Sequence, residues 1–168
     1  MSRRVKCQVT KEMGTSDIFF KAPNGKYYKT EEVYLEWKRT SELRNMCISI
    51  LCDVAGYNEN IVIPTFLNKM VNDIGKKTGF DVLYETIQRH YKDFVWANEH
   101  KEFATELNRL FYYQSIIKNN IIEVYNEHQE EKEQKKREES FVPPEDLTAG
   151  RIVKRGKDLT KILGDDDE

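Results

Sequence analysis

The segment that most constrains the fold is the apolar stretch MCISILCDVA at residues 46–55. Its apolar side chains would point to nearly every side of a helix, and such a helix is stable only when other elements surround it. We therefore expect a helix over residues 31–55, continuous or broken near residues 40–41, whose second half is the most buried part of the protein. Thr30 is suited to cap the start of this helix, and Gly56 is suited to end it.

Three further segments, which begin near Pro64, Asp81 and Lys101, carry apolar residues at the spacing of an amphipathic helix. They predict helices that pack around the apolar stretch, with a loop over residues 75–79 between the first two. Residues 39–126 are therefore expected to form a bundle of about four helices.

The N-terminal residues predict β structure instead. The segments DIFFKA (residues 17–22) and KYYK (residues 26–29) flank Pro23-Asn24-Gly25. Because Asn-Gly readily adopts the positive φ angles of a type I′ turn, we expect a β-hairpin here. Residues 1–38 are therefore predicted to form a small hairpin module.

The C-terminal part of the chain has too few apolar residues to form a core. Residues 127–140 carry charges on all faces and predict a helical extension supported by ion pairs four residues apart. Residues 141–168, which follow with Pro143-Pro144 near their start, are expected to form a flexible tail that binds a partner. The expected fold class is thus α+β and mostly helical, with a small N-terminal β-hairpin module, about four bundled helices, a charged helical extension and a flexible C-terminal tail.

Four positions of the hairpin module have the spacing of a structural zinc site. Cys7 and Thr10 are separated by two residues, and Lys29 and Glu32 by another two. A zinc site can take one pair of ligands from a turn and the second pair from the start of a helix. Only Cys7 is an ordinary ligand for a closed site of this kind, so the sequence predicts no bound zinc and no other cofactor.

The segment KYYKTEEVYLEW resembles the start of the helix in treble-clef and LIM-type zinc modules. We interpret residues 1–38 as a degenerate zinc ribbon that aromatic packing holds together. The alternative is a plain hairpin packed on a helix, with a spacing that arose by chance. The aromatic residues concerned are Phe19, Phe20, Tyr27, Tyr28, Tyr34 and Trp37.

The hairpin pattern FFKAPNGKYYKTEEVYLEWK, followed by a helical domain, also resembles uncharacterised small proteins of bacteriophages and mobile elements of Gram-positive bacteria. This resemblance implies a phage setting and no particular chemistry. The later segment FATELNRLFYYQSIIKNNIIEVY is loosely similar to helical domains of phage replication accessory and helicase-loader proteins.

Composition restricts the setting further. The formal net charge of −2 excludes a global field that would pull the whole chain onto nucleic acid, although residues 1–44 hold ten Lys/Arg against six Asp/Glu. The three cysteines are few and odd in number, which favours free thiols in a reducing compartment. The polar N-terminus carries no signal-peptide pattern, and no apolar run approaches the length of a membrane span. We expect a protein of the bacterial host cytoplasm.

The sequence lacks the motifs of common enzyme classes, and we expect a protein without catalytic activity. It has no Gly-rich phosphate loop, no serine nucleophile elbow and no metal spacing among its histidines. His90, His100 and His128 are predicted to be exposed to solvent. Cys47 and Cys52 are predicted to be ordinary core residues.

Basic residues interleaved with aromatic residues are the best binding signal, because they can contact phosphates and stack on bases. An alternative is that the aromatic residues form a small core and the lysines are merely solvated. In the hairpin module and the following helix the predicted binding residues are Lys21, Lys26, Tyr27, Lys29, Lys38 and Arg39. In the tail they are the basic residues Arg151, Lys154, Arg155 and Lys157 and the apolar residues Leu159, Ile162 and Leu163.

These features favour a non-catalytic phage-type adaptor or accessory protein that acts on nucleic-acid-processing machinery through protein–protein contacts. Two alternatives remain open at this point. One is an inhibitor of a host nucleic-acid enzyme or immune effector that mimics nucleic acid with acidic surfaces. The other is a protein that binds DNA directly. The partner and the oligomeric state are not predicted.

The zinc-site spacing of Cys7, Thr10, Lys29 and Glu32 leads to a testable prediction. We expect the purified protein to hold no stoichiometric zinc and to keep its fold in a chelator, because Thr10 and Lys29 occupy ligand positions. Elemental analysis and thermal melting with and without the chelator check this expectation. One zinc per chain, lost together with the fold on chelation, would contradict it.

Overall fold

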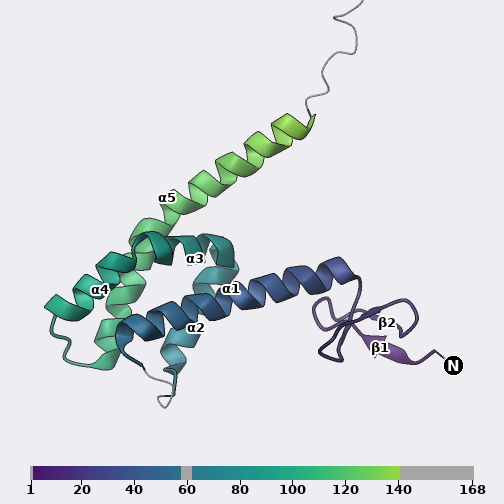
Figure 1. Ribbon diagram of the computed structural model, residues 1–168, viewed down its shortest axis with the longest axis horizontal. Helices are drawn as coiled ribbons and strands as arrows, with labels where there is room; N and C mark the ends of the chain where they lie inside the picture. The colour runs from purple at the N-terminus through teal and green to yellow at the C-terminus, as the bar shows by residue number, and fades with distance from the viewer. Residues whose placement is uncertain (1, 58–61, 141–168) are drawn as a thin grey trace, which may run out of the picture. The chain divides into compact units, whose positions relative to one another are not determined.

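A computed structural model of the protein describes residues 2–57 and 62–140 (Figure 1). The strands are β1 (Arg4–Lys6), β2 (Met13–Thr15), β3 (Phe20–Lys21) and β4 (Tyr27–Tyr28). The helices are α1 (Glu31–Ala55), α2 (Thr65–Thr78), α3 (Phe80–Arg89), α4 (Tyr91–His100) and α5 (Glu106–Ser140). The predicted fold class, mostly helical with a small N-terminal hairpin module, is confirmed. The predicted tail at 141–168 lies outside the described residues.

Helix α1 is one unbroken helix of 25 residues. The hydroxyl of Thr30 accepts a hydrogen bond from the backbone N–H of Val33 at 3.4 Å, and Gly56 ends the helix with a φ of 73°. Both predicted caps are confirmed. The second half of α1 forms the centre of a hydrophobic core that also takes side chains from α2, α3, α4 and α5. The buried residues of α1 are Cys47, Ile48, Leu51, Cys52, Val54 and Ala55.

The predicted loop over residues 75–79 is wrong. Helix α2 continues to Thr78, and Gly79 alone joins it to α3 with a φ of 99°. Gly75 lies inside α2, where an added Cβ would come within 2.3 Å of the Phe80 ring. This glycine therefore serves close packing of Phe80 against the helix and does not mark a loop.

The segment predicted as the third helix is two helices. Helix α3 ends at Arg89 and α4 begins at Tyr91, with His90 between them at φ −102° and ψ 17°. Phe94 is fully buried on α4, as Ile87 is on α3. Ile87 and Phe94 are seven residues apart, a spacing that also falls on one face of a continuous helix, and both belong to the core.

Helix α5 starts later than the sequence predicts. It begins at Glu106, and the Thr105 hydroxyl accepts a hydrogen bond from the backbone N–H of Asn108 at 3.2 Å. A threonine cap of this kind is a stronger start signal than the charged residues near Lys101. The buried residues of α5 are Leu110, Tyr113, Ile117, Ile121 and Val124. The chain divides into two units, residues 1–132 and 133–168, and the last turns of α5 belong to the second.

The hairpin module contains two short antiparallel ladders, β1 with β2 and β3 with β4. The predicted hairpin around Asn24-Gly25 is confirmed, but its turn is not type I′. Gly25 has a φ of 75°, whereas Asn24 does not have a positive φ. The N–H of Gly25 donates to the carbonyl of Ala22 at 2.9 Å, which places Pro23 at the second turn position. Because proline fixes φ near −65°, it favours a type I turn followed by a left-handed glycine.

Aromatic packing forms the core of the hairpin module. Tyr28 is fully buried, and its ring centroid lies 5.0 Å from that of Tyr34 and 5.6 Å from that of Trp37. Phe20 adds a fourth ring, 5.7 Å from Tyr34. Since Tyr34 and Trp37 belong to α1, this cluster holds β3 and β4 against the first turns of that helix.

No helix among the described residues combines the length and the apolar character needed to cross a bilayer.

The core assignment can be tested with two leucine truncations. Leu51 on α1 and Leu110 on α5 are 0% and 1% exposed, so Leu51→Ala and Leu110→Ala should each lower the free energy of unfolding by about 2–5 kcal/mol. Leu107→Ala is the matched control, because Leu107 lies on the same helix and is 45% exposed. Chemical denaturation measures all three, and the control should change stability by less than about 0.5 kcal/mol. Equal effects of Leu107→Ala and Leu110→Ala would show that this face of α5 is wrongly assigned.

Candidate functional site

The predicted binding residues within the described part of the chain lie on the β3–β4 hairpin, just after it at Lys29, and on α1. Lys21 and Tyr27 are opposite each other in the β3–β4 ladder, and Lys26 lies in the turn between them. The predicted lysines Lys21, Lys26 and Lys29 are all exposed, and Tyr27 is half-buried. Lys29 forms an ion pair with Glu12 at 3.0 Å. The remaining two, Lys38 and Arg39, lie on α1, where Lys38 is 3.8 Å from Glu42.

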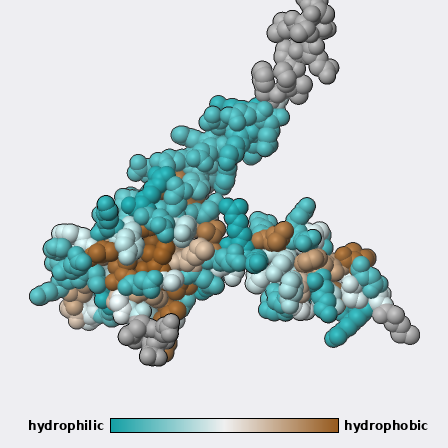
Figure 2. Space-filling view, viewed as in Figure 1, coloured by the Kyte–Doolittle hydropathy of each residue, from teal (hydrophilic) through white to brown (hydrophobic). Residues whose placement is uncertain are grey.

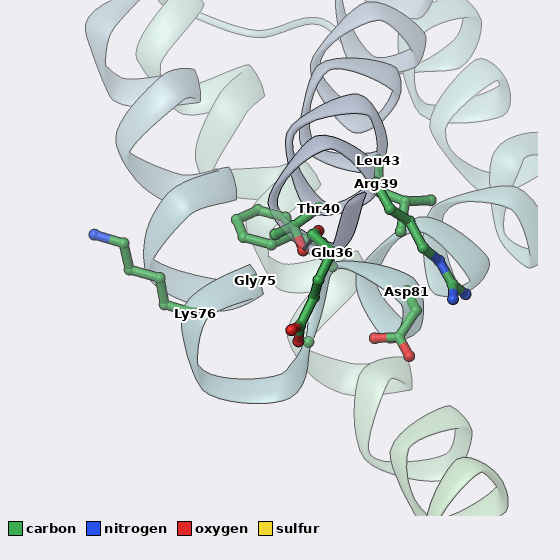
Figure 3. A pocket seen from close by; sticks show the side chains of 9 residues that line it. Glu36, Arg39, Thr40, Leu43, Gly75, Lys76 and Asp81 are labelled. Atoms are coloured by element: carbon green, nitrogen blue, oxygen red, sulfur yellow. Dashed lines mark hydrogen bonds between the residues drawn. The ribbon is translucent and has the colours of Figure 1, made fainter. Parts of the chain in front are cut away.

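Arg39 lines a cleft of about 390 Å³ between α1 and the junction of α2 with α3 (Figure 3). Helix α1 contributes one face at the spacing of successive turns, namely Glu36, Arg39, Thr40 and Leu43. The α2–α3 junction contributes Gly75, Lys76, Gly79, Phe80 and Asp81.

Two glycines shape the lower wall of this cleft. Gly75 lets the Phe80 ring lie directly against α2, and Gly79 supplies the positive φ that the single-residue connection requires. An added Cβ on Gly79 would also come within 2.4 Å of the Asp81 carboxylate. The junction is therefore compact, and Leu43 and Phe80 give the cleft an apolar lining.

The rim of the cleft carries both signs of charge. Figure 3 shows Arg39 and Asp81 on one side of the opening, Lys76 on the opposite side and Glu36 between them. The Thr40 hydroxyl donates to the Glu36 carbonyl at 2.8 Å, so its proton is already engaged within α1. A cleft with an apolar lining and with cations and carboxylates at its edge can bind one segment that carries both charged and apolar groups.

Asp81 also connects the cleft to a polar cluster that joins α3 to α5. Nδ1 of His128 lies 3.7 Å from Asp81, and its Nε2 lies 2.5 Å from Glu85. Arg89 lies 2.6 Å from both Glu85 and Glu127. Hydrogen bonds from His128 and then from Arg89 lower the pKa of the Glu85 carboxyl below its usual range. The same guanidinium lowers the pKa of Glu127, since both bonds favour the ionised carboxylate.

The prediction of exposed histidines is correct only for His100. Its ring stacks on Trp96, with centroids 5.2 Å apart. The His128 side chain is 18% exposed and His90 is 25% exposed, with His90 lying 2.8 Å from Asp93. His128 was missed because its partners Asp81 and Glu85 are more than forty residues away in sequence, and no local pattern links them.

Cys7 is buried at the end of β1, where several donors converge on its sulfur. The backbone N–H of Thr10 lies 3.5 Å from it. Burial would raise the pKa of the Cys7 thiol, but the Thr10 side chain and the backbone amides of Thr10, Val9 and Lys29 outweigh it and lower the pKa to about 7. The structure thus brings together Cys7, Thr10 and Lys29, which are three of the four positions that have the spacing of a zinc site. In residues 2–57 and 62–140 no three His, Cys, Asp or Glu side chains are grouped to hold a metal ion.

The other two cysteines are core residues, as predicted. Cys47 and Cys52 are both free and buried on α1. Burial raises the pKa of the Cys47 thiol to about 12, and burial followed by the nearby Asp53 charge raises that of Cys52. Neither thiol is therefore activated as a nucleophile.

Of the predicted binding residues, seven lie in the tail beyond Ser140 and outside the described residues: Arg151, Lys154, Arg155, Lys157, Leu159, Ile162 and Leu163. The structure instead adds Glu36, Lys76, Phe80 and Asp81 around Arg39. For Lys76, Phe80 and Asp81 the sequence signal is the pair of glycines four residues apart beside Phe80, whereas nothing in the sequence singles out Glu36.

Comparison with known proteins places the chain in a phage family. Residues 7–161 match the family model described as SPbeta prophage protein YorH, and the chain therefore belongs to this family. The expectation of a phage protein is confirmed. No curated protein and no solved structure matches the chain. The match adds no support for a zinc module at the N-terminus.

The cluster at His128 predicts an acid-sensitive contribution to stability. Because the pKa of Glu85 is lowered in the folded protein, its contribution is present above the unfolded value of about 4.3 and is lost as pH falls through the folded value. Glu85→Gln should remove about 0.5–1 kcal/mol at neutral pH, a discounted figure because the side chain is 37% exposed. The difference from the wild-type protein should shrink below about pH 4.

Urea denaturation at neutral and acidic pH measures this difference. Glu42→Gln is the matched control, since Glu42 forms only an exposed pair with Lys38. If Glu85→Gln and the wild-type protein lose stability in parallel as the pH falls, the lowered pKa of Glu85 is wrong.

Proposed function

We propose that this prophage protein is a non-catalytic accessory protein that binds a protein partner through the cleft between α1 and the α2–α3 junction. The observation that carries the proposal is the composition of the cleft. An apolar lining from Leu43 and Phe80 is surrounded by cations and carboxylates. Protein interfaces have this arrangement, with an apolar centre and a polar rim.

The carboxylates of the rim favour a protein over a nucleic acid at this site. Asp81 lies on the same side of the opening as Arg39, and Glu36 lies between Arg39 and Lys76, so each carboxylate would repel a phosphate that approached a cation of the rim (Figure 3). A protein segment that offers one charge of each sign next to an apolar side chain satisfies all four groups. A volume of about 390 Å³ accommodates a few side chains of such a segment.

Apolar side chains on the surface of the helices also support a role in protein contacts. Figure 2 shows apolar surface gathered on the helical part of the molecule. Leu107 and Phe111 on α5 are each 45% exposed, Trp96 on α4 is 51% exposed and Ile122 on α5 is 65% exposed. Adjacent exposed apolar side chains are typical of surfaces that a partner covers, and Leu107 and Phe111 lie four residues apart on one face of α5.

The class of partner is proposed from the phage setting. Membership of a prophage family, together with the loose similarity of α5 to phage replication accessory proteins, favours a component of the nucleic-acid-processing machinery. The alternative of an inhibitor uses the same contacts on a host nuclease or immune effector. The two are separated by the effect on the partner, because an inhibitor abolishes its activity at near-stoichiometric amounts.

The proposal is tested by identifying the partner and measuring its affinity for cleft variants. Tagged protein is used to recover partners from infected Gram-positive host cells, and each candidate is then purified and titrated. Arg39→Glu and Lys76→Glu should each weaken binding by about tenfold or more, because each substitution replaces an attractive charge at the rim with a repulsive one. Lys92→Glu is the control, because Lys92 is an equally exposed lysine on α4 outside the cleft.

Undiminished affinity of both cleft variants for the purified partner would exclude the cleft as the contact. Turnover of a substrate by the purified protein alone would exclude a purely non-catalytic role.

A further inference from the structure

The hairpin module is strongly basic although the chain as a whole is weakly acidic. Residues 2–30 hold seven Lys/Arg and two Asp/Glu, a surplus of five positive charges. Since the whole chain has a net charge of −2, the remaining residues carry a net charge of −7. Positive charge is therefore concentrated on the first thirty residues, where it creates a local field that the overall balance conceals.

In each of the two ladders, part of this charge points away from the buried side of the strand. Val5 is buried, so Arg4 and Lys6, its exposed neighbours on β1, point to the opposite face. On β4 Tyr28 is buried, and Tyr27 therefore points outward together with Lys21, its partner in the ladder. We call Arg4, Lys6, Lys21, Lys26 and Tyr27 the outer face of the module.

The two ladders that carry the outer face are joined. The backbone N–H of Gln8, just after β1, donates to the carbonyl of Tyr27 on β4 at 2.9 Å. This bond joins β1 to the β3–β4 hairpin, so the outward side chains of both ladders belong to one connected module.

The cations of the outer face are available to a ligand. Across residues 2–57 and 62–140, the ion pairs of the module involve only Lys29, which binds Glu12. Arg4, Lys6, Lys21 and Lys26 are all exposed and form no such pair in that part of the chain. Four unpaired cations within a small module are suited to contact successive phosphates of a nucleic-acid backbone.

Tyr27 favours a single strand over a duplex. Tyr27 is half-buried, and it lies opposite Lys21 in the β3–β4 ladder. A fixed and partly exposed aromatic ring can stack on a base only if that base is unpaired. An acidic protein surface would be attracted by the cations but would gain little from this ring.

We propose that the outer face of the hairpin module binds single-stranded nucleic acid, with Arg4, Lys6, Lys21 and Lys26 contacting phosphates and Tyr27 stacking on a base. This site is separate from the cleft and does not rest on the proposed protein contact. It assigns the two surfaces of the protein to two classes of ligand.

The test is fluorescence anisotropy of a labelled oligothymidylate of about 20 nucleotides, a length that exceeds common single-strand site sizes, titrated with the full-length protein at several salt concentrations. Binding should weaken as salt rises, with a slope of about −0.7 per phosphate contact in a plot of log K against log salt. The double variant Arg4→Glu/Lys6→Glu should reduce both the affinity and this slope. Arg4→Gln/Lys6→Gln should have a smaller effect in the same direction.

Substitutions of Tyr27 separate stacking from charge. Tyr27→Ala should weaken binding about tenfold with little change in the salt slope, whereas Tyr27→Phe should retain affinity. Lys69→Glu/Lys92→Glu removes two exposed lysines from α2 and α4 and should leave binding unchanged. Thermal melting of every variant confirms that the module is folded.

The proposal is overturned if the oligonucleotide does not bind at low salt. It is also overturned if polyglutamate or duplex DNA binds as tightly as the single strand and Tyr27→Ala has no effect. That pattern would show a general attraction for polyanions or an acidic protein ligand.

Discussion

Burial of the second half of α1 is the packing constraint on which the rest of the structure depends. Leu51 and Cys47 are fully buried, and side chains of α2 to α5 complete the core around them. Burying a large apolar side chain contributes about 1.5–3 kcal/mol, so a helix with six buried residues commits its neighbours to surround it. The first turns of the same helix carry Tyr34 and Trp37, which pack on β4. One continuous helix therefore takes part in both the core of the bundle and the core of the hairpin module.

Features set by local chemistry could be predicted from the sequence. The apolar stretch at 46–55, the Thr30 cap and the Gly56 terminus each act through neighbouring residues, and all three are confirmed. The hairpin at Asn24-Gly25 could be predicted for the same reason, although the central residues of its turn are Pro23 and Asn24. By contrast, nothing near His90 distinguishes a break from a continuous helix. Ile87 and Phe94 are seven residues apart and would share one face of a continuous helix, so their apolar pattern does not reveal the break.

The candidate site is even harder to predict from the sequence, because it depends on contacts between residues far apart in the chain. Arg39 was recognised as a binding residue, but its neighbours in the cleft come from a junction about forty residues later. The cluster of Glu85 with His128 joins positions 43 residues apart. Such pairings leave no periodic pattern in one sequence. Helix α1 also links the hairpin module to the cleft, since Tyr34 in the aromatic cluster and Leu43 in the cleft lie about 14 Å apart along a helix that rises about 1.5 Å per residue.

The glycine at position 75 has a consequence for how the protein can diverge. Any side chain there would have to displace the Phe80 ring, which lines the cleft and packs against the core. A substitution at the bottom of the cleft would therefore also disturb packing of the core. The rim residues Arg39 and Lys76 are exposed and carry no such restriction. Under the proposed function, related prophage proteins would change partner preference by exchanging rim charges and would keep the shape of the cleft.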